Sequence, residues 1–167
     1  MKDLGYFAPT DVGEALKFLA EYGEKATVLA GGTDLVPRIN YYELRPDSLM
    51  DIGKLGLNFI EDKGSKVVMG ATTTWKQIAE STILLEKMGV LTGAAKQGAC
   101  VAVRNAGTVG GNLVNASPAG DLTAVLLALD AELFLKSSDS ERTVHIQDFF
   151  TGPGKSVRKA NELLIEI

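Results

Sequence analysis

The stretch RNAGTVGGNLVNASPAGD, residues 104–121, holds four glycines and three asparagines, but one arginine and no lysine. A second glycine pair lies upstream in VLAGGTDL, residues 28–35. Glycine lets other groups approach the main chain closely, and successive backbone N–H groups can converge into an anion-binding nest. We therefore expect both stretches to bind an anion such as a diphosphate through neutral amides. Because Gly110 has no side chain, we expect it to leave room for the diphosphate to approach the backbone.

Polar side chains around the glycines suggest what else the ligand carries. Thr33 and Thr108 can donate through their hydroxyls, and Asn112 and Asn115 can both donate and accept. Asp121 only accepts when it is ionised, so it would repel phosphate but suits the hydroxyls of a ribose. A diphosphate at the glycines and a ribose at the aspartate together describe a dinucleotide.

Other interpretations of these glycines have to be weighed. A glycine pair alone is a weak signal, because most such pairs are tight turns, and here a glycine-rich helix–strand junction is the structural alternative. The nicotinamide fingerprint GxGxxG is missing, since the spacing around Gly107, Gly110 and Gly111 is GxxGG. The segment FFTGPGKS, residues 149–156, ends like a phosphate-binding P-loop, but Phe149 stands where that motif requires glycine.

Bulk composition excludes several classes of protein. The 167 residues suffice for one domain or two small subdomains, and the net charge of -4 with no basic cluster argues against nucleic acid as a partner. No apolar run approaches a membrane span, and the N-terminus lacks a secretory signal, so we expect a cytoplasmic protein. Cys100 is the single cysteine, so the chain alone holds neither a disulfide nor an iron–sulfur cluster nor a zinc site.

The first third of the chain predicts a small βαβ-like lobe. Thr10 is expected to cap a helix that carries Asp11 in its first turn. Apolar runs at 26–30 and 48–52 predict two strands, with a helical turn starting at Thr33 or Asp34 between them. Strand, connection and strand make a parallel pair plausible.

A boundary is expected near residues 53–56, followed by a larger mixed lobe. Thr74 is expected to cap a helix, and 83–99 to be helical in pieces because glycines interrupt it. The predicted organisation is α+β, with a small α/β subdomain at 1–53 carrying the first glycine loop and a larger α+β subdomain at 54–167 carrying the second. The further predicted elements are strands at 57–61, 66–69, 131–135, 142–146 and 163–167 and a helix at 121–129.

The segments AGGTDL and RNAGTVGGNLVNASPAGDLTAVLLALDAELFL also carry a family resemblance. They resemble the FAD-binding subunit of the molybdenum hydroxylases, which include xanthine dehydrogenase, carbon monoxide dehydrogenase and 4-hydroxybenzoyl-CoA reductase. The similarity runs from YFAPT to FFTGPGKSVRKANELLIEI, nearly the whole chain. It implies a two-subdomain fold of the PCMH/vanillyl-alcohol-oxidase-like type, with FAD held in an extended form between the subdomains.

The resemblance also implies which residues bind the cofactor. Both glycine loops would contact the diphosphate, Asp121 would lie on the adenosine side, and Leu164 or Ile165 would lie near the flavin ring. No catalytic residue and no metal ligand is implied on this chain. The full implied set is Val28, Leu29, Ala30, Gly31, Gly32, Thr33, Asp34, Leu35, Gly98, Thr108, Val109, Gly110, Gly111, Asn112, Asp121, Leu164 and Ile165.

Partners follow from the same resemblance. In the family, the flavin of an oxidoreductase complex takes electrons from iron–sulfur clusters on a small subunit, which are reduced by a molybdopterin site on a large subunit. The flavin then passes them to NAD or another acceptor, while the family's C-terminal domain is absent from this sequence. Two alternatives stay open: a stand-alone FAD-dependent oxidoreductase of the wider superfamily, and an assembly or interaction module without flavin.

Overall fold

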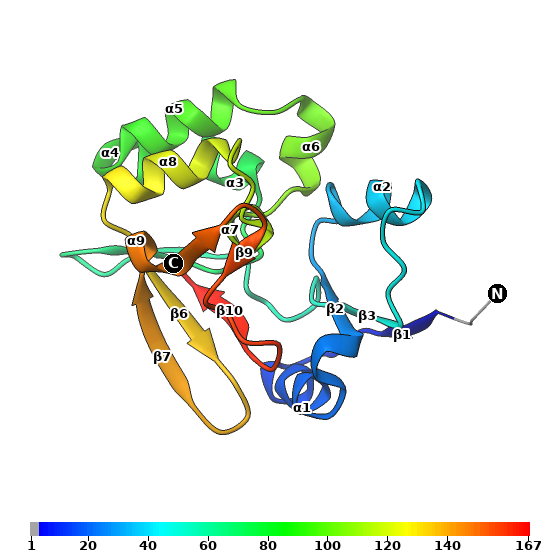
Figure 1. The fold of residues 1–167 in the computed structure, drawn as a ribbon. Coiled ribbons are helices and arrows are strands. Elements are labelled where there is room, and N and C mark those ends of the chain that lie inside the picture. Colours follow the sequence, from blue (N-terminus) through cyan, green and yellow to red (C-terminus); the bar gives the residue numbers. More distant parts are fainter. Residues whose placement is uncertain (1–3) are drawn as a thin grey trace.

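The computed structural model describes residues 4–167, which begin with a small parallel sheet (Figure 1). Its strands are β1 (Gly5–Phe7), β2 (Ala26–Leu29) and β3 (Ser48–Asp51), in the order β1-β3-β2. The predicted parallel pairing of β2 with β3 is confirmed, with Thr27 opposite Leu49. β1 was not predicted, because three residues carry too little periodicity to announce a strand.

Helix α1 (Val12–Tyr22) packs against this sheet and begins one residue later than the prediction implied. Asp11, not Thr10, is the N-cap: its carboxylate accepts the amide of Glu14 at 2.9 Å. The Thr10 amide instead donates to the Glu14 carboxylate at 3.0 Å. Both residues suit a cap, and the sequence alone could not choose between neighbours. The 3-10 turn η1 (Gly23–Lys25) then leads into β2.

Antiparallel strands form the second half. β6 (Glu132–Lys136) lies between β10 (Leu163–Glu166) and β7 (Glu141–His145), while β4 (Ile60–Asp62) pairs with β5 (Val67–Met69). Met69 and Ile167 exchange main-chain hydrogen bonds of 2.8 and 2.9 Å, which join the end of β5 to the end of β10. A short hairpin, β8 (Phe150–Gly152) with β9 (Lys155–Ser156), follows α9 (Ile146–Phe149).

Helices cover this half, with α4, α5 and α8 lying together at the upper left of Figure 1. The predicted cap at Thr74 is present as a capping box with Gln77, with hydrogen bonds of 2.8 and 3.2 Å between backbone and side chain. None of the helices formed by residues 4–167 is long and apolar enough to cross a membrane. The helices are α2 (Leu35–Asn40), α3 (Trp75–Glu80), α4 (Thr82–Lys87), α5 (Gly89–Gln97), α6 (Val101–Ala106), α7 (Val109–Asn115) and α8 (Asp121–Ala128).

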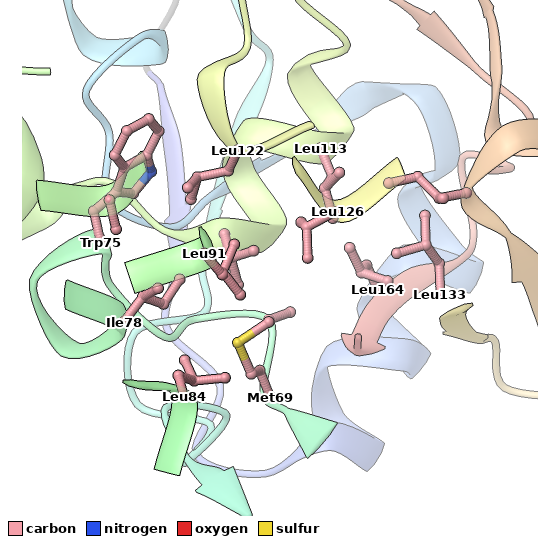
Figure 2. Close-up of a cluster of buried hydrophobic side chains, with 14 of the residues drawn as sticks. Met69, Trp75, Ile78, Leu84, Leu91, Leu113, Leu122, Leu126, Leu133 and Leu164 are labelled. Carbon is pink, nitrogen blue, oxygen red and sulfur yellow. The ribbon is translucent and has the colours of Figure 1, made fainter. Parts of the chain in front are cut away.

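Two buried apolar clusters hold these layers together, and β10 contributes to both. Leu164 points into the larger cluster, which Figure 2 shows with Met69, Trp75 and the helix leucines. Leu163 and Ile165 point the other way, into the cluster formed by α1, β3 and the residues after them. Alternate side chains of a strand face opposite sides, so one strand seals two cores. The predicted division at 53/54 stays a prediction, and the cluster around α1 draws on residues from both sides of it.

Candidate cofactor-binding site

A cavity of about 590 Å³ lies between the first glycine loop, the α6–α7 junction and the start of β10. Its volume is in the range of small-molecule and cofactor pockets, roughly 300–1,000 Å³. The parallel strand β2 leads directly into it. The predicted residues that line it are Val28, Ala30, Gly31, Gly32, Thr33, Asp34, Leu35, Thr108, Gly110, Gly111, Asn112 and Leu164.

The first glycine loop presents backbone donors without acceptors. Among residues 4–167, nothing accepts a hydrogen bond from the amides of Gly31, Gly32, Thr33 or Asp34. Gly32 has a φ of +68°, a left-handed conformation that glycine adopts without strain. Gly31 and Gly32 are half-buried and Thr33 and Asp34 are exposed, so this run of consecutive free amides beside a cavity is available to a ligand that accepts from them.

The second glycine stretch is a helix, and its first amides are already used. Val109 N donates to Thr73 O and Gly110 N donates to Ala71 O, each at 2.9 Å. The expectation that this stretch offers bare amides to an anion is therefore wrong at these positions. The physical reason is that α7 begins against residues 71–73, whose carbonyls take the donors that a helix N-terminus leaves unpaired.

Glycines let the first loop and the α6–α7 junction pack backbone against backbone. A Cβ on Gly31 would overlap the carbonyl of Ala106 and lie 3.1 Å from the Cα of Gly107. A Cβ on Gly107 would lie 3.3 Å from the Oγ1 of Thr33. The two stretches singled out in the sequence thus touch each other, and side chains there would force them apart.

The next two glycines occupy the first turn of α7 and face different ways. A Cβ on Gly110 would meet the carbonyl oxygen of Ala71 at 2.6 Å, so this position faces the fold. A side chain at position 110 would therefore clash with Ala71. The absence of a side chain at Gly110 serves the packing of α7, rather than the approach of a diphosphate as expected. Gly111 is exposed at the cavity, and its amide donates to the capping hydroxyl of Thr108 at 3.0 Å.

Asp121 and Gly98 lie beside the cavity rather than in its lining. A Cβ on Gly98 would lie 2.9 Å from Oδ2 of Asp121 and 2.5 Å from Cζ3 of Trp75. Trp75 is buried in the larger core, as a packing anchor should be, and it also lines the cavity. These residues place Asp121 at the helical flank of the cavity, and its role toward an adenosine stays a prediction.

Three further predicted residues are outside the lining. Val109, the first residue of α7, is fully buried, and Ile165 belongs to the core around α1. Leu29 is half-buried at the end of β2. Of the two candidates on β10, Leu164 lines the cavity and Ile165 does not.

Two arginines in the lining were missed by the sequence reasoning. Arg38 is exposed on α2 and pairs with Asp34 at 3.5 Å. Arg158 is half-buried, and its Nη1 donates to the carbonyl oxygens of Glu162 at 2.7 Å and Lys159 at 3.1 Å. No local pattern marks Arg158, because chain folding after β9 brings it to the cavity.

Comparison with known proteins identifies the family. Residues 2–167 match the family model described as the FAD binding domain in molybdopterin dehydrogenase. The chain belongs to this family. It is 36% identical over 163 residues to the carbon monoxide dehydrogenase medium chain of Hydrogenophaga pseudoflava, covering 97% of this chain and 57% of the relative. It is 32% identical over 164 residues to the xanthine dehydrogenase FAD-binding subunit of Escherichia coli O157:H7, covering 96% and 55%.

Solved structures agree with this assignment. A carbon monoxide dehydrogenase from Hydrogenophaga pseudoflava superposes with a TM-score of 0.95 at 35% identity, covering 98% of this chain and 57% of that one. Quinoline 2-oxidoreductase from Pseudomonas putida 86 gives 0.94 at 27% identity, covering 98% and 57%. The predicted α+β FAD-binding fold is confirmed. The chain spans rather more than half the length of these relatives.

The structure fits the cofactor of this FAD-binding domain family. Free donors at Gly31–Asp34 match a diphosphate, and the apolar wall formed by Val28, Leu163 and Leu164 suits an aromatic ring system. The touching glycine stretches of the first loop and the α6–α7 junction both contribute to the lining of the cavity.

Proposed function

We propose that this chain binds FAD in an extended form along the cavity and serves as the flavin component of a molybdopterin-dependent dehydrogenase. The observation that carries the proposal is the run of partnerless amides at residues 31–34, beside a cavity of about 590 Å³. Neutral donors of this kind hold a diphosphate without a cluster of lysines. That explains how a chain of net charge -4 accommodates a dianionic linker.

The two glycine stretches divide the binding work in this proposal. The first loop donates its amides and the hydroxyl of Thr33 to the diphosphate. The second stretch supplies shape, because α7 turns its exposed glycine, Gly111, and the side chain of Asn112 toward the cavity. Asn112 Oδ1 accepts from Thr123 Oγ1 at 3.3 Å, which orients its amide group. Asp121, beside Trp75, takes the ribose of the adenosine.

Electron transfer is the proposed role of the bound cofactor. FAD supplies the redox chemistry, and the chain's residues place it and set its electrostatic surroundings. Electrons would arrive from iron–sulfur clusters on a small subunit, reduced by a molybdopterin site on a large subunit, and leave to NAD or another acceptor. The relatives support this division, since they bear the names medium chain and FAD-binding subunit. No residue of the chain is assigned a proton-transfer or nucleophilic role.

An absorbance spectrum before and after FAD addition and desalting tests the proposal. We expect about one equivalent of FAD to remain bound, because the amide donors and the cavity are both present in this chain. Riboflavin is the matched control, since it carries the ring without the diphosphate, and we expect it to bind much more weakly. A folded chain that retains neither FAD nor any flavin after desalting would refute FAD binding by these residues. Substrate turnover by the isolated, flavin-loaded chain would favour a stand-alone oxidoreductase instead.

A further inference from the structure

A buried carboxylate near the cavity is fully occupied by partners other than Arg158. Glu162 is 2% exposed. Its carboxylate accepts from Nε of Arg142 at 2.8 Å and from Nη2 at 2.9 Å, a two-point pairing. The amide of Lys159 donates to the same carboxylate at 2.7 Å. The ion pair of Glu162 is therefore formed with Arg142, which lies in β7.

Arg158, in contrast, has no ion-pair partner of its own at the cavity among residues 4–167. Only its Nη1 is engaged, by two carbonyl oxygens, and within residues 4–167 it forms no ion pair. The other lining arginine, Arg38, has Asp34 and Glu43 as partners. Burial lowers the pKa of the Arg158 guanidinium, with Glu162 partly opposing the shift, and arginine stays charged. A half-buried cation held in place with free donors favours an anionic partner.

The cavity has two flanks, which differ in character. Trp75 and Gly98 with Asp121 mark the helical flank, where a carboxylate suits ribose hydroxyls. A second, apolar flank of the lining holds Leu163 and Leu164, and Arg158 lines the cavity with them and bonds to the carbonyl of Glu162, just before β10. Under the proposed function, the diphosphate lies at the first glycine loop and the adenosine lies on the helical flank, beside Asp121. The isoalloxazine ring then takes the apolar flank that contains Arg158.

We propose that Arg158 places a fixed positive charge beside the isoalloxazine ring and thereby favours its reduced, anionic form over its oxidised, neutral form. Two-electron reduction with uptake of one proton leaves a negative charge on the ring, and charge near the ring nitrogens tunes flavin electronics. No bond to Arg158 forms or breaks, and the electrons come from whatever reductant reaches the flavin. This inference rests on the proposed function, since it concerns FAD in the same cavity.

The test is the midpoint potential of FAD bound to the purified chain, measured by reductive titration against a reference dye. Arg158→Gln should weaken binding of reduced FAD about tenfold more than binding of oxidised FAD. For a two-electron couple this corresponds to a potential lower by about 30 mV. Arg158→Lys retains the charge and should recover most of the difference. Lys159→Gln removes a charge from the same turn at an exposed side chain, so it should leave the potential unchanged.

The outcomes separate this inference from the proposed function. A wild-type chain that binds no FAD refutes both. FAD binding with the same potential in wild type and Arg158→Gln refutes the inference alone. Weaker binding of oxidised FAD, with riboflavin binding and potential unchanged, also overturns it, because the guanidinium would then serve the diphosphate.

A second variant keeps the inference testable if Arg158→Gln does not fold. Arg158→His carries an imidazole whose ordinary pKa is about 6.5. Its potential should rise, relative to wild type, as the pH falls through that range and the imidazole gains its proton. A potential that follows the wild-type pH dependence throughout would refute a ring-side charge at this position.

Discussion

Gly31→Ala should open the contact between the first loop and the α6–α7 junction. The new Cβ would overlap the carbonyl of Ala106, lying 2.6 Å from its carbon, and would be 3.1 Å from the Cα of Gly107. Carbon atoms prefer about 3.5–4.0 Å, so the two backbones must separate by on the order of 1 Å. Forcing a methyl group into such a contact costs about 1–3 kcal/mol. The same movement displaces the amide donors of the loop.

Urea unfolding and FAD titration together measure this effect. We expect the free energy of unfolding to fall by about 1–3 kcal/mol and FAD affinity to fall about tenfold or more, a loss of roughly 1.4 kcal/mol. Gly93→Ala is the matched control. Gly93 lies inside α5 with nothing within 4 Å of its added Cβ, so alanine should stabilise the helix by about 0.5–1 kcal/mol and leave FAD binding unchanged.

An unchanged stability and an unchanged FAD affinity in Gly31→Ala would refute the reasoning. A loss of affinity without loss of stability would show that the loop shifts freely and that only the ligand senses it. Gly32→Ala should behave differently, because its cost comes from the φ of +68° and from Val36 Cγ2 at 3.0 Å rather than from the opposite loop. That cost is about 1–2 kcal/mol.

Three other changes test separate parts of the structure. Glu162→Gln leaves Arg142 without its carboxylate and should destabilise the fold by about 2–3 kcal/mol in urea unfolding. Arg142 also lowers the pKa of Glu162 below its ordinary 4.5. Stability from this pair is therefore present above about pH 4.5 and lost as the pH falls through the lower, folded-state pKa, and acid titration of the Gln variant should lack that loss. Thr74→Ala removes the capping box with Gln77 and should cost about 1 kcal/mol by thermal or urea unfolding. Asp121→Ala should weaken FAD about tenfold but leave riboflavin binding unchanged, and equal losses in titrations of both ligands would contradict an adenosine-side role.

Local signals in the sequence predicted several elements correctly. The cap at Thr74 and the parallel strands at either side of residues 31–47 depend on neighbours within a few positions. The first glycine loop was recognisable because it follows a short apolar strand, and its backbone amides are free to meet a ligand. Such features can be predicted because their cause is contained in the same short segment.

Features that depend on distant contacts could not be predicted in this way. α7 contains two adjacent glycines, which disfavour a helix by about 1 kcal/mol each. It forms because Thr73 and Ala71 accept its first amides and because Val109 and Leu113 are fully buried. β1 exists because β3 pairs with it, and nothing within its own three residues requires a strand.

Contacts between distant segments also explain why the second glycine stretch does not offer the free amides that its sequence predicts. A run of glycines beside asparagine is typical of a nest of free amides, yet here the amides of Val109 and Gly110 are bonded to the protein. Of the two stretches expected to offer free amides, only the first has them, at residues 31–34, and the guanidinium of Arg158 adds a positive charge at the cavity. In our proposal, the amides bind the diphosphate, whose charge does not change on reduction, whereas Arg158 lies beside the ring, whose charge does change. Substitutions in the first loop should therefore alter affinity for both redox forms alike, and substitutions at Arg158 should separate them.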